Sequence, residues 1–331
     1  MARIASLSLS ARITLDLHNL NSEGTEGNQQ QTRMVHILDQ RGERAVVNAI
    51  SGDSFKHILV EHLIPLLSRE DQPLSPGARL HDADRINAFN QDFVDFCEKE
   101  GEFTVNGRTQ RRRALDSEVL TRMLQECSLT DVAGALVTRG RAVARKSVVE
   151  FGWVVGLPDR TMTEQYFHVK YAPEGRGQAA GGDTVAGRQA IFHRPASSGE
   201  YAVICNLDLW RIGLNDITRQ YVVDASSRAT RARAVLHALA ATLLKPAGAQ
   251  RNTQNPHIVA CRGVVSTSAT SLPAPTVSPL ADDYLDQIER SAGVLNAIEP
   301  GSVRVTAFET LADGTHQLAV IASDVELVEV G

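Results

Sequence analysis

The sequence predicts an α+β domain built on one large sheet, with two long insertions between its elements. Apolar residues occupy every odd position over Leu7–Leu17, and a period of two indicates a strand buried on one face. A hairpin and a helical pattern follow, and further strands and helices then surround excursions at about 69–116 and 158–200. No G-x-G-x-x-G follows a strand and no Walker A motif occurs, so we do not expect a doubly wound nucleotide-binding sheet.

Composition limits the class of protein. With 331 residues, 43% of them hydrophobic, the chain can form one large domain or two ordinary ones. It has no run of about 18 apolar residues that would span a membrane, and its first residues lack a signal-peptide hydrophobic region. The four cysteines form no CxxC pair, which is typical of reduced thiols without a zinc site. We therefore expect a cytoplasmic protein with no cofactor and no metal.

The charge of the chain leaves nucleic-acid binding open. The formal net charge is −5, which taken alone argues against a generic nucleic-acid binder. Of the 34 basic residues, however, 29 are arginine and five are lysine. Arginine offers a planar fork for phosphate and a flat face for stacking, although a GC-rich genome produces the same excess. Placement of the arginines therefore matters more than their number.

The predicted elements follow in order along the chain. After the first strand, a polar loop with turn residues leads to a hairpin of Met34–Leu38 and Ala45–Ile50. The next helix has apolar residues at helical spacing from Phe55 to Leu67 and Ser51 as its N-cap. The remaining expected helices are 86–99, 116–127, 227–244 and 280–291, and the expected strands are 142–155, 166–171, 189–193, 201–212, 303–308 and 316–322, with a Ser/Thr/Pro linker at 266–279.

One constellation at a helix start could bind phosphate. In Ser51-Gly52-Asp53-Ser54-Phe55-Lys56, free backbone amides, the helix dipole, two hydroxyls and a lysine come together. The same residues also describe an ordinary capped helix with a solvated lysine. Both readings stay open at this stage.

For several other polar groups, the sequence does not decide between a structural role and nucleic-acid binding. The loop residues Asn19, Asn21 and Arg33 are either turn residues or donors beside the polar face of the first strand, which carries Arg12, Thr14, Asp16 and His18. Arg111–Arg113 is either a solvated run or an element that follows a phosphate backbone. Arg176, Arg188, His193 and Arg194 lie on a glycine-rich hairpin, which is either a mobile surface loop or a basic arm. No Ser/His/Asp or paired-carboxylate site can be assembled.

Three segments together resemble a known family. The strings SARITLDLHNLNSEG, NAISGDSFKHILVEHL and VARKSVVEFGWVVG occur in this order between residues 10 and 156, and the resemblance extends over most of the chain. They resemble the DevR-type branch of the Cas-seven family, the backbone subunits of type I CRISPR surveillance (Cascade) complexes within the RAMP superfamily. The resemblance implies a modified RRM-like, ferredoxin-like palm, a helical fingers insertion and a β-hairpin thumb. On this chain the palm would be 1–68, 116–157, 200–265 and 293–331, the fingers 69–115, the thumb 158–199, and 266–292 a linker with a short helix.

The resemblance also implies a function. The chain would be a non-catalytic subunit that oligomerises along guide RNA (crRNA) and presents the spacer for pairing with target DNA, beside copies of itself and other Cascade subunits. RRM aromatics are absent from the polar face of the first strand, so we expect contacts mainly to phosphate and ribose. The candidate RNA-binding residues are His18, Asn19, Asn21, Arg33, Ser51, Gly52, Ser54, Lys56, His57, Arg112, Arg145, Lys146, Arg176, Arg188, His193 and Arg194.

Three alternative functions remain open. A RAMP-type endoribonuclease that processes guide RNA needs a general base, and His193 near Gly187 is the candidate. A subunit that cleaves target RNA, as in type III systems, would use an aspartate and a divalent metal. A transcriptional autoregulator, suggested by the historical name of the family, has no helix-turn-helix signature here.

Overall fold

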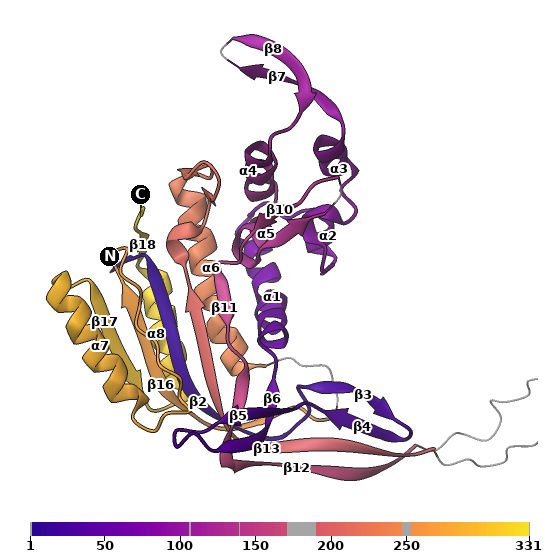
Figure 1. The fold of residues 1–331 in the computed structure, drawn as a ribbon, viewed down its shortest axis with the longest axis vertical. Helices are drawn as coiled ribbons and strands as arrows, with labels where there is room; N and C mark the ends of the chain where they lie inside the picture. The colour runs from indigo at the N-terminus through magenta and orange to yellow at the C-terminus, as the bar shows by residue number, and fades with distance from the viewer. Residues whose placement is uncertain (1, 106, 139, 171–189, 247–252, 331) are drawn as a thin grey trace, which may run out of the picture.

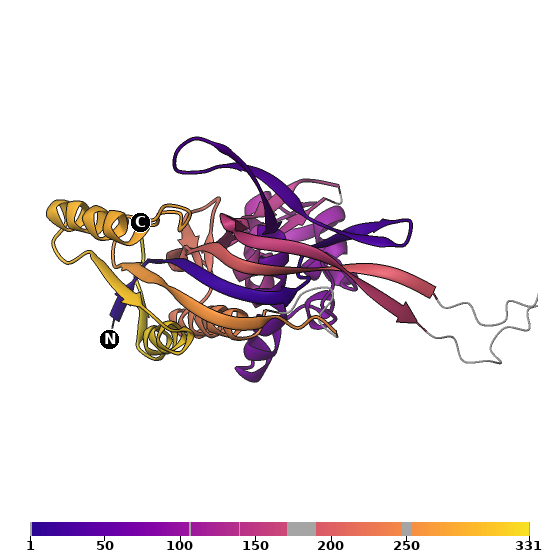
Figure 2. The same cartoon turned by 90° about the horizontal axis from the view of Figure 1, so that it is seen from below.

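One large, mainly antiparallel sheet organises the protein (Figures 1 and 2). The computed structural model describes residues 2–105, 107–138, 140–170, 190–246 and 253–330. The strands of this sheet are β2 (Ser6–His18), β3 (Ser22–Glu26), β4 (Gln29–Thr32), β5 (Met34–Leu38), β6 (Arg44–Ile50), β11 (Val149–Phe151), β12 (Val154–Lys170), β13 (Ala190–Leu207), β16 (His257–Ser268) and β17 (Val303–Phe308). The main path runs β17-β16-β2-β13-β12-β6-β5, and β11 and β4 also pair with β13.

Helices lie on both faces of the sheet. The helices α1 (Gly52–Arg69), α6 (Ala225–Leu244) and α8 (Leu311–Ser323) cover one face, and α7 (Tyr284–Ile298) lies on the other (Figure 2). Adjacent residues of β16 show the division, because Val265 belongs to the main core and Val264 packs against Tyr284 and Ile288 of α7. None of the helices in the described ranges is long and apolar enough to cross a membrane.

The predicted first strand is confirmed as β2. Leu7, Leu9 and Leu15 are fully buried on the helix-covered face, as the period of two requires. The hairpin β5–β6 and the helix α1 also occur where they were predicted, with Ser51 as the N-cap of α1. The described residues thus form the mixed helix-and-sheet fold that the sequence predicts.

The fingers segment, defined here as residues 69–115, projects away from the sheet (Figure 1). It contains α2 (Pro76–Arg79), η1 (Arg85–Asn87), α3 (Gln91–Glu98), β7 (Glu100–Val105) and β8 (Arg108–Arg113). The expected helix over 86–99 is therefore α3 preceded by one short turn, and Arg111–Arg113 lies on a hairpin strand. Next come α4 (Asp116–Glu126), α5 (Ser128–Ala133), and the paired β9 (Ala135–Val137) and β10 (Val143–Arg145).

Several other expectations about elements are corrected. Residues 316–322, expected as a strand, belong to α8, because the side-chain oxygen of Thr310 caps a helix that buries Leu318 and Ala322. Ser266–Ser268, expected in the linker, end the strand β16. The expected strand at 142–155 is divided among β10, β11 and the start of β12. The remaining elements are η2 (Leu209–Arg211), β14 (Leu214–Asn215), β15 (Gln220–Tyr221), and β1 (Ala2–Ile4) parallel to β18 (Val325–Leu327).

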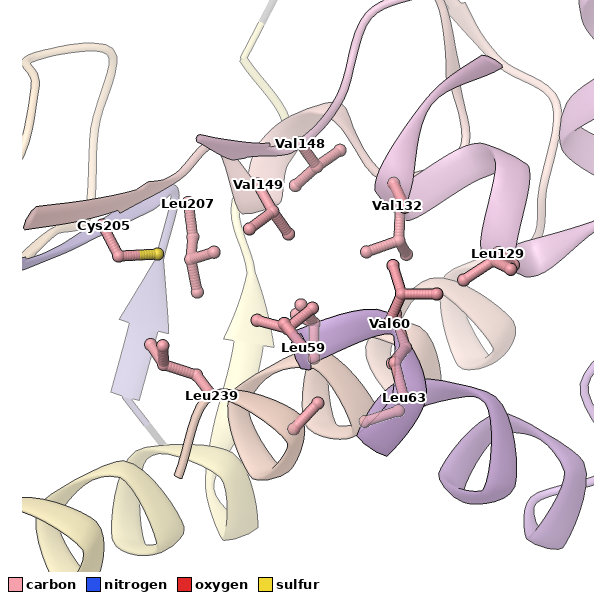
Figure 3. Close-up of a cluster of buried hydrophobic side chains, with 14 of the residues drawn as sticks. Leu59, Val60, Leu63, Leu129, Val132, Val148, Val149, Cys205, Leu207 and Leu239 are labelled. Atoms are coloured by element: carbon pink, nitrogen blue, oxygen red, sulfur yellow. The ribbon is translucent and has the colours of Figure 1, made fainter. Parts of the chain in front are cut away.

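A buried cluster fixes α1 between the sheet and α5 (Figure 3). Leu59, Val60 and Leu63 of α1 lie among Leu129 and Val132 of α5, residues of the sheet and Leu239 of α6 (Figure 3). Leu59 and Leu63 are fully buried, and each such side chain contributes roughly 1.5–3 kcal/mol of burial free energy. This packing sets the position of the first turn of α1, where the candidate site lies.

Candidate nucleic-acid interface

The start of α1 forms a capped helix N-terminus against the sheet. The Oγ of Ser51 accepts a hydrogen bond from the amide of Ser54 at 3.2 Å, and the two hydroxyls lie 2.8 Å apart. A Cβ at Gly52 would lie 2.5 Å from the carbonyl oxygen of Phe151, so only glycine permits this close approach. Helix N-terminal amides lack intrahelical partners and carry partial positive charge, which favours an anion there.

A hollow opens directly over this helix start. We call it the α1 hollow; it has a volume of about 370 Å³. Besides the first turn of the helix, it is bordered by residues from β11 and from the segments before it and after it. Its lining residues are Arg33, Ser51, Gly52, Asp53, Lys56, Ser147, Val149, Glu150, Phe151 and Trp153. Residues separated by more than 100 positions in the chain therefore meet at the predicted phosphate cradle.

Lys56 places a partly buried cation in the α1 hollow. Partial burial lowers the pKa of its ammonium group, and the nearby charge of Arg85 lowers it further. Asp53 and Glu150 act in the opposite direction. Within the described residues, the ammonium group forms neither a hydrogen bond nor an ion pair. A partly desolvated cation of this kind gains most from a bound anion.

Trp153 adds an aromatic surface that our sequence reasoning missed. Its side chain is 47% exposed, and the guanidinium of Arg33 lies 5.2 Å from its ring centroid. The Nε of Arg33 also donates to Glu23. A solvent-exposed tryptophan beside an arginine suits stacking against a base or a ribose. An apolar FGWVVG string predicts a buried strand, and only the structure shows that this ring faces solvent.

The strand–asparagine loop is buried and has a positioning role. His18 Nε2 lies 3.0 Å from the hydroxyl of Tyr201, which donates to Asn48, and burial lowers the pKa of His18 to about 4. The amide of Asn21 donates to the carbonyls of Arg33 and Ala49. Asn19 is also buried. These side chains are enclosed and fix the strands that carry Arg33 and Ser51, and RNA contact by them stays a prediction.

The polar face of β2 is covered by the chain itself. Ser8 Oγ donates to the carbonyl of Ala274, and Ser10 Oγ lies 3.1 Å from Thr276 Oγ1. The guanidinium of Arg12 donates to the carbonyl of Pro279 at 2.8 Å and forms an ion pair with Asp282. The segment 274–282 therefore occupies the surface where the sequence left either solvent or a ligand open. The side chain of Arg12 is enclosed by this segment, and only Thr14 and Asp16 of the proposed stripe remain half-exposed.

Arg145 is a core residue. Its guanidinium is fully buried and donates to Asp131 at 2.8 Å and to Asp216 at 2.9 Å. Arg231 donates to the second carboxylate oxygen of Asp131 at 2.7 Å. The charge of Arg145 is therefore compensated inside the protein, which argues against an RNA contact by this residue. Lys146 is exposed, but it does not border the α1 hollow.

The other candidates lie apart from the α1 hollow or at its edge. His57 is exposed, with Nε2 3.8 Å from Glu61. Arg112 makes two 2.8 Å hydrogen bonds to Glu118 and stacks over Phe103, so its charge is already paired. On the hairpin of β12 and β13, the ring of His193 packs edge-on against Phe167, and Arg194 stacks over Phe192 and donates to Thr253. Arg176, Arg188 and the glycine-rich tip lie outside the described residues.

Comparisons with known proteins concern the family and the fold of the chain. A family model described as "CRISPR-associated negative auto-regulator DevR/Csa2" matches residues 9–289. No curated protein matches the chain. A chain of a structure titled "CRISPR RNA-guided surveillance complex, pre-nicking" is 12% identical, with a TM-score of 0.53, over 96% of this chain and 100% of that one. This similarity supports a shared fold.

Two further solved structures are less similar. A chain of a "CRISPR RNA-guided surveillance complex" is 12% identical over 96% of this chain and 98% of that one, with a TM-score of 0.44. Csc2 of Thermofilum pendens is 11% identical over 96% of this chain and 81% of its own, with a TM-score of 0.38. The family match covers most of the sequence and confirms the family that the three motifs indicate. The chain therefore belongs to the DevR/Csa2 family of CRISPR-associated proteins.

Proposed function

We propose that this protein is a non-catalytic backbone subunit that binds guide RNA in a type I CRISPR surveillance complex. Copies of the chain would lie side by side along the guide and present its spacer for pairing with a target DNA strand. Other subunits of the complex would complete the assembly. The proposal rests on family membership and on the chemistry of the α1 hollow.

The unpaired ammonium group of Lys56 is the observation that carries this proposal. It lies in a hollow beside a helix N-terminus, where amides and the helix dipole also favour negative charge. A phosphate bound there would pair directly with an ammonium group that Asp53 and Glu150 offset only at longer range in the described part of the chain. This contact is independent of base identity, as a subunit that accepts any spacer requires.

The surroundings of Lys56 suit ribonucleic acid in particular. Ser51 borders the α1 hollow, its hydroxyl lies 2.8 Å from that of Ser54, and the exposed ring of Trp153 can stack against a base. Such groups recognise phosphate, ribose and the flat face of a base, and they do not read base edges. Tolerance of sequence follows from this arrangement, and a preference for RNA over DNA would come from hydrogen bonds of the serine hydroxyls with ribose 2′-hydroxyls.

The charge distribution accommodates RNA on an acidic chain. Residues 280–331 contain ten acidic and two basic residues, a net charge of −8, so residues 1–279 carry a net charge of +3. The C-terminal elements from α7 onward hold most of this excess acid and extend beyond the residues that the family model matches. The acidic balance therefore does not oppose RNA binding at α1.

The test compares the affinities of different nucleic acids for the purified protein. We expect guide RNA with a scrambled spacer to bind as tightly as the natural guide, and DNA of the same sequence to bind more weakly, as measured by fluorescence anisotropy. A strong preference for one spacer sequence would contradict a backbone role. Metal-independent cleavage of repeat RNA that His193→Ala abolishes would instead establish the endoribonuclease alternative. Metal-dependent cleavage of target RNA would establish the alternative of a subunit that cleaves target RNA.

A further inference from the structure

A second hollow lies against α1, next to the fingers segment. We call it the fingers-side hollow; its volume is about 210 Å³. Val60 and Ile64 of α1 form part of an apolar wall, and the polar border comes from both α1 and the segment 81–85. Its charged and imidazole side chains are Asp53, Lys56, His57, His81, Asp82 and Arg85. Lys56 and Asp53 border both this hollow and the α1 hollow, so the two adjoin at one cation and one carboxylate.

Two like charges meet in the fingers-side hollow. Burial is the main cause that lowers the pKa of both Lys56 and Arg85, and the charge of Arg85 further lowers the pKa of Lys56. Arg85 Nη1 donates to the carbonyls of Ala133, at 3.0 Å, and Gly134 at the end of α5. These bonds hold the guanidinium in place without neutralising it. Two partly buried cations that repel one another form an unfavourable arrangement unless an anion binds between them.

The carboxylates nearby do not fill this role. Asp82 Oδ1 accepts a hydrogen bond from the amide of Asp84 at 2.8 Å, and Asp53 is exposed in the first turn of α1. Within the described ranges, neither carboxylate forms an ion pair with Lys56 or Arg85. Asp53 and Glu150 offset part of the charge of Lys56 without an ion pair among the described residues, so its ammonium group can still contact a ligand anion directly.

We propose that Lys56 and Arg85 together bind a phosphodiester group of the guide RNA in the fingers-side hollow. Since Lys56 also borders the α1 hollow, the RNA backbone would pass from the helix start toward the fingers segment, with Lys56 between two phosphates. Arg85 would give the fingers segment a direct part in holding RNA. This inference rests on the proposed function and adds a site that the sequence motifs do not contain.

The first test removes the charge of Arg85 from the full-length protein. Arg85→Gln should weaken binding of a guide-length single-stranded RNA about tenfold at low salt, and should make the slope of log K against log salt shallower by about 0.7. Arg69→Gln, at the far end of α1, is the matched control, because its exposed arginine borders neither hollow. It should leave both values unchanged. An Arg85→Gln variant with wild-type affinity and slope would overturn the inference.

A second pair of variants leaves Arg85 and its hydrogen bonds in place. Ala83 is exposed and borders the fingers-side hollow, so Ala83→Glu brings a negative charge to the site without disturbing the core. It should weaken RNA binding several-fold, whereas the neutral Ala83→Gln should not. Equal affinities of these two variants would count against the site, even if Arg85→Gln failed to fold.

Two outcomes separate this inference from the proposed function. If the wild-type protein does not bind RNA, the proposed function fails. If the wild-type protein binds RNA and Lys56→Ala weakens this binding, but Arg85→Gln and Ala83→Glu do not, only the fingers-side site fails. Binding of inorganic phosphate, a small anion, is measured separately as a rise in the melting temperature of the protein. A rise that Arg85→Gln abolishes, with RNA binding unaffected by that variant, would identify a site for free phosphate and overturn the RNA assignment.

Discussion

Asp131→Asn should destabilise the protein more than any other change in its buried ionic cluster. The carboxylate of Asp131 is fully buried and accepts from Arg145 at 2.8 Å, from Arg231 at 2.7 Å and from the amide of Gly213 at 2.9 Å. The amide of an asparagine would leave two buried guanidinium groups with less negative charge. Breaking a buried pair typically costs about 3–5 kcal/mol. Because Asp216 still pairs with Arg145 at 2.9 Å, we expect about 3 kcal/mol.

Equilibrium urea unfolding measures this loss as a lower midpoint at an unchanged slope. Asp216→Asn is the matched control, because that carboxylate is 25% exposed and its loss should cost about 1 kcal/mol. Asp131→Asn should also leave the salt dependence of RNA binding unchanged at temperatures where the variant is folded. A variant within about 0.5 kcal/mol of wild type, the usual range for surface substitutions, would refute the structural role of the cluster and return Arg145 to the list of candidate RNA contacts.

Three further predictions follow from single sites. Burial lowers the pKa of His18 from 6.5 to about 4, so the unfolded chain binds more protons than the folded protein between these pH values. The free energy of unfolding should therefore decrease as the pH falls below 6.5, by about 2 kcal/mol at pH 5. His18→Gln should flatten this pH dependence in denaturation curves measured between pH 4 and pH 7. Gly52→Ala should cost about 1–3 kcal/mol because its Cβ would lie 2.5 Å from the carbonyl oxygen of Phe151, whereas Gly293→Ala in α7, with nothing within 4 Å, should stabilise slightly; equal unfolding midpoints would contradict this packing argument. Trp153→Ala should weaken RNA binding by about 1–3 kcal/mol in anisotropy titrations while Trp153→Phe retains most of the affinity, and an alanine variant that binds normally would exclude stacking.

Elements with strong local signals were predictable from the sequence. The alternation over β2 and the N-cap and apolar spacing of α1 are properties of neighbouring residues, so the sequence contains them directly. The strand expected at 316–322 was wrong for a local reason. The buried face of α8 consists of Gly314, Leu318 and Ala322. Because glycine is not counted as an apolar residue, the helical spacing of this face was not recognised in the sequence. A Cβ at Gly314 would lie 2.8 Å from the ring of Phe308, so packing against β17 explains the glycine.

The errors about the site arise from long-range contacts. Nothing near Ser8 or Arg12 in the sequence shows that residues 274–282, more than 260 positions later, cover the polar face of β2. Likewise, Arg145 and Lys146 form an adjacent basic pair in the sequence, and the sequence does not show that Arg145 pairs with Asp131 of α5. The same limitation hid Trp153 and Arg85, whose exposure and proximity to Lys56 arise from the tertiary structure. The capped start of α1 at Ser51–Lys56 was predictable because a helix start is a local feature.

The salt dependence of RNA binding by Lys56→Ala tests the central claim most directly. Lys99→Ala is the control, since Lys99 is an exposed lysine of the fingers segment, paired with Asp95 and outside both hollows. If the α1 hollow binds guide-RNA phosphate, Lys56→Ala should weaken binding equally for natural and scrambled guides and make the slope of log K against log salt shallower by about 0.7 or more. Lys99→Ala should bind as the wild type does. A correctly folded Lys56→Ala variant with wild-type affinity and slope would contradict the account and leave the first turn of α1 with only a structural role.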